Sequence, residues 1–189
     1  MAIRSLKTNS FSRSLLVGNA GYDPADFRSI ATITVGSGGV TSLEFTSIPS
    51  TYTHLQIRAS MVNASNNYSI KLRFNSDSGT NYSAHQITGT GSAVALGAES
   101  NIDIAIFGVG AYSTSLYTGA LVAEILDYSN TNKYKTVNTL SGGDGNGVGQ
   151  VKHVSTAWRS TNAITSIYIN ADGSTFNQYT HFALYGIRS

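Results

Sequence analysis

The side chains that could hold a metal or transfer a proton are few and scattered along this chain of 189 residues. Its four histidines show no HxH or HExxH pattern and no acid at a metal-ligand spacing; they are His54, His85, His153 and His181. Single histidines within strands are usually exposed or satisfied by one hydrogen bond. We therefore expect no metal site and no cofactor.

Three acids lie close to apolar stretches: Asp103, Glu124 and Asp127. Two carboxylates that met across a sheet could catalyse general acid-base chemistry, so a hydrolase acting on a cell-surface polysaccharide is one hypothesis. The sequence contains no GxSxG nucleophile elbow, and it has no cysteine to pair with a histidine. We expect that the protein is not an enzyme.

Two polar loops have the composition, but not the context, of ligand-binding loops. Segment 142–149 is rich in glycine, yet a strand-like stretch, Gln150–Trp158, follows it. A phosphate-binding loop needs a following helix and usually a Lys-Ser/Thr pair, so this segment predicts a hairpin loop. Segment Asn75–Gly79 is rich in oxygen ligands but lacks the distal glutamate of a calcium loop. It predicts an Asx turn.

The segments that must position these residues alternate apolar and polar side chains. His54–Val62 and Tyr68–Asn75 do so almost without interruption, which predicts two strands with one buried and one wet face. Residues 63–67 favour turn geometry, so we expect these two strands to pair with each other. We likewise expect Ser29–Val35 and Val40–Phe45 to form a hairpin around the glycine loop 36–39.

About eleven short strands are predicted from Phe27 to the C-terminus, separated by turn residues. Strands at this spacing are typical of a sandwich, a jelly roll or a barrel. Segment Leu116–Leu126 has apolar residues at both its odd-numbered and its even-numbered positions. This predicts a strand covered on both faces, with a helix as the alternative. The chain thus divides into an N-terminal arm, residues 1–26, and one all-β domain, residues 27–189.

Charge is low and unevenly placed. Only 12% of residues are charged, and the net charge of +2 arises from the arm, where residues 1–22 hold three basic side chains and no acid. This balance argues against binding of duplex DNA, and the chain has no apolar run long enough for a membrane-spanning helix. Leu15–Val17 is too short for the apolar core of a signal peptide. The apolar spacing in the arm fits a short amphipathic helix, an extended peptide or a disordered tail.

Three stretches resemble proteins of tailed bacteriophages, particularly phages of marine bacteria and cyanobacteria. The opening MAIRSLKTNSFSRSLLVGNAGYDP is similar to the start of virion structural proteins. SIPSTYTHLQIRAS at Ser47–Ser60 and THFALYGIRS at Thr180–Ser189 resemble the jelly-roll module of such proteins, which often finish in a strand reading LYGI. Together they cover about a quarter of the chain. The resemblance implies a jelly-roll type β-sandwich that belongs to the virion.

Two functions follow from this resemblance. The first is a capsid decoration, or cement, protein, which is typically a trimer seated on the major capsid protein. The alternative is a tail-fibre or receptor-binding module that recognises host-surface carbohydrate. We prefer the first and expect a homotrimer on the capsid surface of a virion assembled in the bacterial host cytoplasm, with no nucleic-acid or membrane partner.

Two sets of residues are expected to carry the capsid decoration function. The arm would bind the capsid through its apolar and basic side chains: Ile3, Arg4, Leu6, Lys7, Phe11, Arg13, Leu15 and Leu16. Trimer formation would cover the second apolar face of the segment Leu116–Leu126, which gives the predicted subunit interface of Leu116, Leu121, Ala123 and Ile125.

Overall fold

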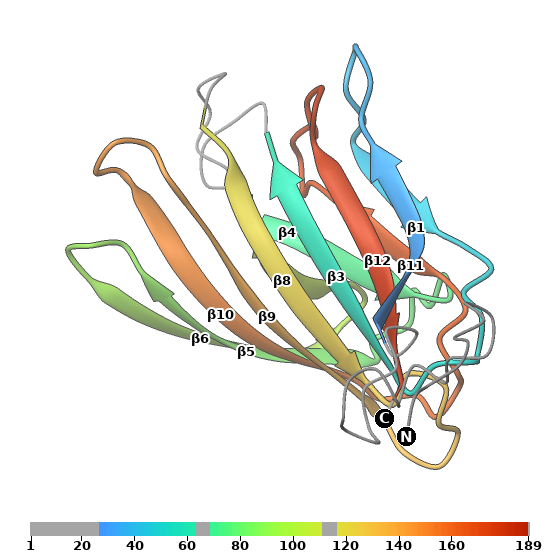
Figure 1. Cartoon of the computed structure of the whole chain (residues 1–189). Coiled ribbons are helices and arrows are strands. Elements are labelled where there is room, and N and C mark those ends of the chain that lie inside the picture. The colour runs from blue at the N-terminus through green and yellow to red at the C-terminus, as the bar shows by residue number, and fades with distance from the viewer. Residues whose placement is uncertain (1–26, 63–68, 111–116, 189) are drawn as a thin grey trace, which may run out of the picture.

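A computed structural model describes residues 27–62, 69–110 and 117–188, and within them twelve strands form two antiparallel sheets that face each other (Figure 1). The large sheet has eight strands in the order β1 (Phe27–Thr34), β12 (His181–Ile187), β3 (His54–Met61), β8 (Gly119–Leu126), β9 (Lys135–Asp144), β10 (Gly149–Trp158), β5 (Tyr82–Gly89) and β6 (Val94–Ile102). The small sheet has four, in the order β2 (Ser42–Phe45), β11 (Ile167–Asn170), β4 (Ser69–Phe74) and β7 (Ala105–Val109). The predicted all-β sandwich is confirmed.

Eight of the twelve strands follow the order of a jelly roll. Strands β1, β12, β3 and β8 are neighbours in the large sheet, and β2, β11, β4 and β7 are neighbours in the small one. Between the described strands, the chain crosses from one sheet to the other at eight connections: β1 to β2, β2 to β3, β3 to β4, β4 to β5, β6 to β7, β7 to β8, β10 to β11 and β11 to β12. Such wrapping is the pair of Greek keys that defines a jelly roll. The other four strands form two hairpins, β5–β6 and β9–β10, which widen the large sheet beyond β8.

Two predicted strand pairs are wrong because of this wrapping. Strand β1 pairs with β12 rather than with β2, and β3 pairs with β12 and β8 rather than with β4. The alternation of apolar residues correctly identified the buried face of each strand. It carries no information about which strand lies beside it, and a connection between layers uses the same turn residues as a hairpin.

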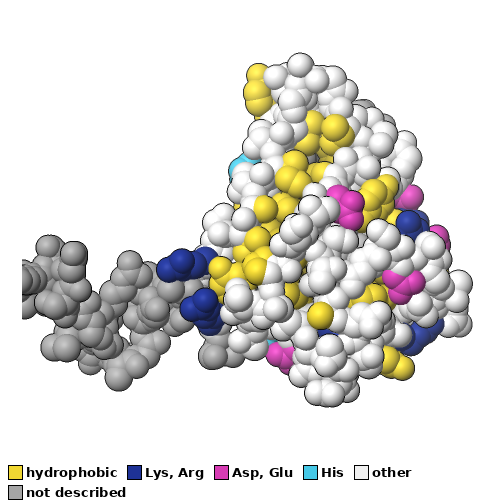
Figure 2. Space-filling view, turned by 90° about the vertical axis from the view of Figure 1, so that its right-hand side faces the viewer, with side chains coloured by type: hydrophobic (Ala, Val, Ile, Leu, Met, Phe, Trp, Pro, Cys, Tyr) yellow, Lys and Arg dark blue, Asp and Glu magenta, His cyan; other side chains and the backbone are white. Residues whose placement is uncertain are grey.

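The core fills the space between the two sheets. Its largest fully buried side chains include Trp158, Tyr82, Phe74 and Phe107, with the rings of Phe74 and Trp158 5.4 Å apart. Along the edge strand β1, Ile30 and Ile33 are only partly buried against this core. Hydrophobic side chains reach the surface in a diagonal band on that side of the molecule (Figure 2).

Segment Leu116–Leu126 forms strand β8, so the helix alternative is wrong. Its inner side chains Leu121, Ala123 and Ile125 are at most 1% exposed and lie in this chain's own core. Because they are buried, they cannot touch a second subunit, and the prediction that they form a subunit interface is corrected. Leu116 lies outside the described residues. On the outer face of β8, the side chains of Val122 and Leu126 are each about two-fifths exposed. Within this chain the strand is therefore covered on one face only.

Packing against Tyr52 explains the glycine of the C-terminal LYGI motif. Gly186 of β12 faces the core, and a side chain at this position would run into the aromatic ring of Tyr52. Tyr52 packs against the core and also carries Arg188 over its ring, 5.5 Å from the ring centroid. Glycine is therefore required for the close approach of Tyr52 to the last strand.

We predict that Gly186→Ala lowers the free energy of unfolding by about 1–3 kcal/mol, because the added methyl group displaces the Tyr52 ring. In a Tyr52→Ala background the same substitution should cost less, since the ring is gone and the two sites are coupled. Urea unfolding of the four proteins of this double-mutant cycle measures both values. Equal losses in the two backgrounds would contradict the proposed contact.

Candidate interaction surface on the large sheet

The acids that could have formed a catalytic pair are held in separate contacts. Asp103 pairs with Arg73 of the small sheet at 3.1 Å, whereas Glu124 lies on the outer face of the large sheet and accepts a hydrogen bond from Gln56. Asp127 contacts Lys133, and its backbone N–H donates to His54 Nδ1 at 2.9 Å. The carboxylates that the hydrolase hypothesis requires are therefore occupied by different partners.

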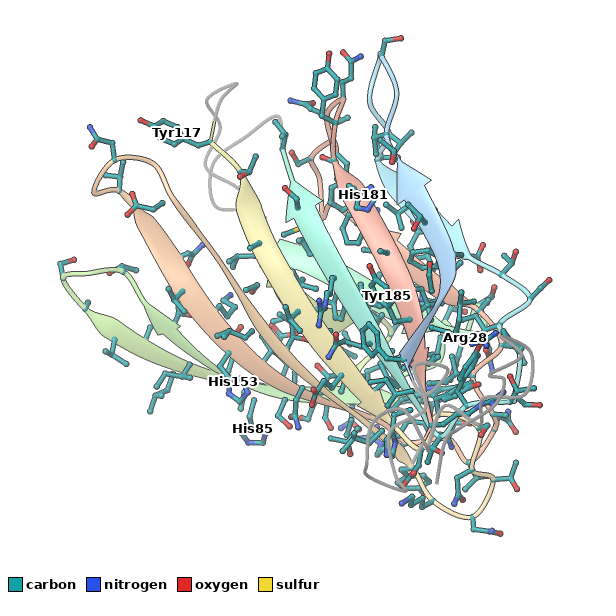
Figure 3. All side chains as sticks on the ribbon, in the orientation of Figure 1. Arg28, His85, Tyr117, His153, His181 and Tyr185 are labelled. Carbon is teal, nitrogen blue, oxygen red and sulfur yellow. The ribbon has the colours of Figure 1, made fainter. Side chains whose placement is uncertain are left out.

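The histidines do not converge on a metal site. His54 accepts from Asp127, and His181 lies 3.0 Å from the hydroxyl of Thr34. His85 and His153 come from the neighbouring strands β5 and β10, and both project from the outer face of the large sheet (Figure 3). Among the described residues, no three His, Cys, Asp or Glu side chains are placed to hold a metal ion.

Segment 142–149 forms the predicted hairpin. Strand β9 continues to Asp144 and β10 begins at Gly149, with the backbone of Gly147 donating to Asp144 Oδ1 at 2.9 Å. This tip and the tip of β5–β6 flank an open cleft of 520 Å³ that is lined mostly by glycines. A strand rather than a helix follows this loop, and Asp144 places a negative charge beside the cleft, so the cleft does not have the helix N-terminus or the charge of a phosphate site.

Segment Asn75–Gly79 forms the predicted Asx turn. The backbone N–H of Gly79 donates to Asp77 Oδ1 at 2.9 Å, and Asn81 and the Trp158 indole donate to the same carboxylate, the latter at 2.7 Å. Burial by itself raises the pKa of Asp77, but these hydrogen bonds outweigh it and hold the pKa below its ordinary value. The carboxylate is used to anchor Trp158 rather than to bind calcium.

One buried lysine, which the sequence did not single out, also has a structural role. Lys135 is fully buried, and its ammonium donates to the backbone carbonyls of Asn130, Lys133 and Thr161 at 2.6, 2.9 and 3.3 Å. Burial, and to a lesser extent Lys133, lowers its pKa. The three carbonyls replace the water lost on burial, and the lysine ties the loop between β8 and β9 to the segment after β10.

The outer face of the large sheet carries an apolar surface that sequence reasoning missed. Strand register places Val122 beside Leu140, Leu140 beside His153, His153 beside Ile87, and Ile87 beside Leu96. A second row runs through Ala120, Gly142, Val151, Gly89 and Val94. We call the six large apolar side chains of these rows the outer apolar patch: Ile87, Val94, Leu96, Val122, Leu140 and Val151. All six are more than 40% exposed.

Beside the patch, on strands β3, β12 and β1 of the same face, is a cluster of aromatic and charged side chains, in which Arg58 is the register partner of Val122. The guanidinium of Arg58 lies over the rings of Phe27 and Tyr185, at 5.2 and 5.7 Å from their centroids. The two rings stack at 4.8 Å, and Arg58 donates to Gln56 Oε1 at 2.7 Å. The predicted arm residues lie outside the described residues, and the arm joins the body at Phe27, inside this cluster.

Comparisons with known proteins add no family to this description. No protein-family model matches the chain, and neither the curated proteins nor the solved structures include a significant match. Within the described part of the chain, no helix is long and apolar enough to cross a membrane.

We predict that Asp77 makes the protein less stable in acid. A carboxyl group whose pKa is lower when folded stabilises the fold above its unfolded value of 3.8 and loses that contribution as pH falls through the lower folded value. The free energy of unfolding, measured by urea titration from pH 6 to pH 2, should fall less steeply for Asp77→Asn than for the natural protein.

Trp158→Phe is the matched variant for this test, because it removes one donor to Asp77 and keeps the carboxyl group. Its acid slope should lie between those of the other two proteins. Parallel curves for Asp77→Asn and the natural protein down to pH 2 would show that Asp77 does not contribute to acid sensitivity.

Proposed function

We propose that the protein is a capsid decoration protein of a tailed bacteriophage, which binds the major capsid protein through its N-terminal arm and stabilises the head as a homotrimer. The observation that carries this proposal is the uncharged, exposed outer apolar patch on a body whose acids and histidines are not assembled into a catalytic or metal site. An exposed apolar patch of this kind is typical of a protein that packs against other proteins.

The sequence resemblance supports the same proposal. The segments Ser47–Ser60 and Thr180–Ser189, which resemble virion jelly rolls, include strands β3 and β12 at the centre of the jelly-roll part of the large sheet. Tyr52 and Gly186, from these two segments, are in close contact, so the motif is a packing feature of the fold. A shared fold does not determine function, and the resemblance of the opening segment adds the virion context.

The arm has a composition suited to binding a protein shell. It combines three basic side chains with regularly spaced apolar ones, and it joins the body at the edge strand β1. A trimer would present three arms, so each arm that binds raises the effective concentration of the next. Individually weak arm contacts would then hold the trimer on a capsid.

The alternative function is carbohydrate recognition by a tail-fibre or receptor-binding module. One observation favours it: the exposed Tyr117 and Tyr179 precede β8 and β12, whose starts lie at the same end of the sheet (Figure 3). Aromatic rings at a loop surface can stack on sugars. A glycan array probed with the full chain tests this function, and a Tyr117→Ala/Tyr179→Ala double variant that binds equally well would remove these residues from it.

We predict that deletion of residues 1–22 leaves a folded oligomer that no longer binds capsids. The reason is that the arm supplies the capsid contacts while the body holds the subunits together. Co-sedimentation with phage heads stripped of the protein measures binding, and unfolding curves confirm that the body is intact.

A full-length control replaces Arg4, Lys7 and Arg13 by Gln and should bind more weakly, with a smaller dependence on salt. Full capsid binding by the deletion variant would exclude the arm from the mechanism. Electron microscopy of intact particles with a labelled antibody separates the two functions: label on the head supports decoration, and label at the tail supports the alternative.

A further inference from the structure

We propose that the outer apolar patch binds a second copy of this chain. This inference rests on the trimeric role proposed above and deepens it by naming the surface through which the copies meet. Three observations on this face carry it: its lack of charge, the free edge of the sheet beside it, and the match between a protruding side chain and a hollow.

Charge favours a second copy over the other candidate, the arm. The two rows of the patch contain no Lys, Arg, Asp or Glu from β8 to β6. Two identical copies therefore meet without repulsion between like charges. Residues 1–22 of the arm hold three basic side chains and no acid, and the patch offers them no carboxylate. A basic peptide would gain nothing electrostatically from this surface.

The patch continues to an open sheet edge. Among the described strands, β6 pairs only with β5, so the backbone groups on its other side have no strand partner. Natural edge strands are usually protected by lysine, proline or an inward-pointing charge. Strand β6 has neither lysine nor proline, and its one charged residue, Glu99, lies on the inner side of the sheet, opposite to Val94 and Leu96. This inward-pointing charge protects the inner side of the edge and leaves the outer side apolar. The large apolar side chains of β6, Leu96 and Val94, are 81% and 70% exposed.

The same face contains both a protrusion and a hollow. Leu96 projects from β6, and a shallow apolar hollow of 320 Å³ lies over β8, β9 and β10, lined by Ala120, Val122, Leu140 and Gly142 among others. Gly142 forms its floor, and a side chain there would collide with the backbone carbonyl of Gln150. One copy can thus insert Leu96 into the hollow of a second copy. The rotation that relates the two copies decides whether contacts of this type close into a ring.

The size of the patch fits the centre of a subunit interface. Two rows across five strands cover about 24 Å by about 14 Å, on the order of 300 Å². A standard interface buries about 800 Å² on each partner and surrounds an apolar centre with a polar rim. The flanking outer positions Asn138, Ser155 and His85 supply such a rim.

The test is the oligomeric state of the full chain by sedimentation velocity. The natural protein should sediment as an oligomer of its 20.0 kDa chain. Leu96→Glu and Leu140→Glu should each weaken association by about tenfold or more, because each buries a charge at the contact. Thr32→Glu is the matched control, since Thr32 lies at the other end of the same row, on the opposite edge strand, and should leave association unchanged.

Unfolding curves must show that the variants stay folded, as expected for exposed positions. A monomeric natural protein would overturn the inference, as would glutamate variants that associate as strongly as Thr32→Glu. Binding to phage heads is a separate measurement. Loss of association in the Leu96→Glu variant together with absence of the chain from phage heads would support the self-contact and reject the capsid function.

Discussion

Every layer of this molecule depends on one constraint: each jelly-roll strand buries one side of its pleat against the opposite sheet. Ile57, Leu72, Leu121 and Ile169, from both sheets, are almost completely buried for this reason. The small sheet has only four strands, whereas hairpins β5–β6 and β9–β10 extend the large sheet to eight. The extension creates a wide outer face that the chain itself does not cover. The interaction surface is thus a consequence of adding hairpins to one side of a jelly roll.

The sequence predicted the strands and their buried faces well, because a period of two is a local property. It also predicted the hairpin at segment 142–149 and the turn at Asp77, where the chemistry of neighbouring residues decides the geometry. Strand partners were wrong for β1 and β3, since a turn such as 36–39 can lead either to the adjacent strand or to the other sheet. Only the packing of the two complete sheets against each other distinguishes these outcomes.

The interaction surface was harder to predict for two physical reasons. Its side chains come from β5, β6, β8, β9 and β10, and register alone makes Ile87, Leu140 and Leu96 members of one row. In β8 the predicted interface residues had the wrong parity: Leu121 faces the core and Val122 faces outward. A shift of one residue exchanges the two faces of a strand. Because both faces of β8 carry apolar side chains, the sequence pattern does not determine which face is buried.

The two ends of the outer face suit different contacts. Arg58, Phe27 and Tyr185 lie where the arm joins the body, and their charge and rings are already paired with one another. The outer apolar patch lies across β8 to β6, and β10 at its centre is five strand spacings from β1, about 24 Å. Copies that met through the patch would leave the arm attachment uncovered. Self-association and binding through the arm could therefore take place at the same time, which is the arrangement that several weak arm contacts need in order to act together.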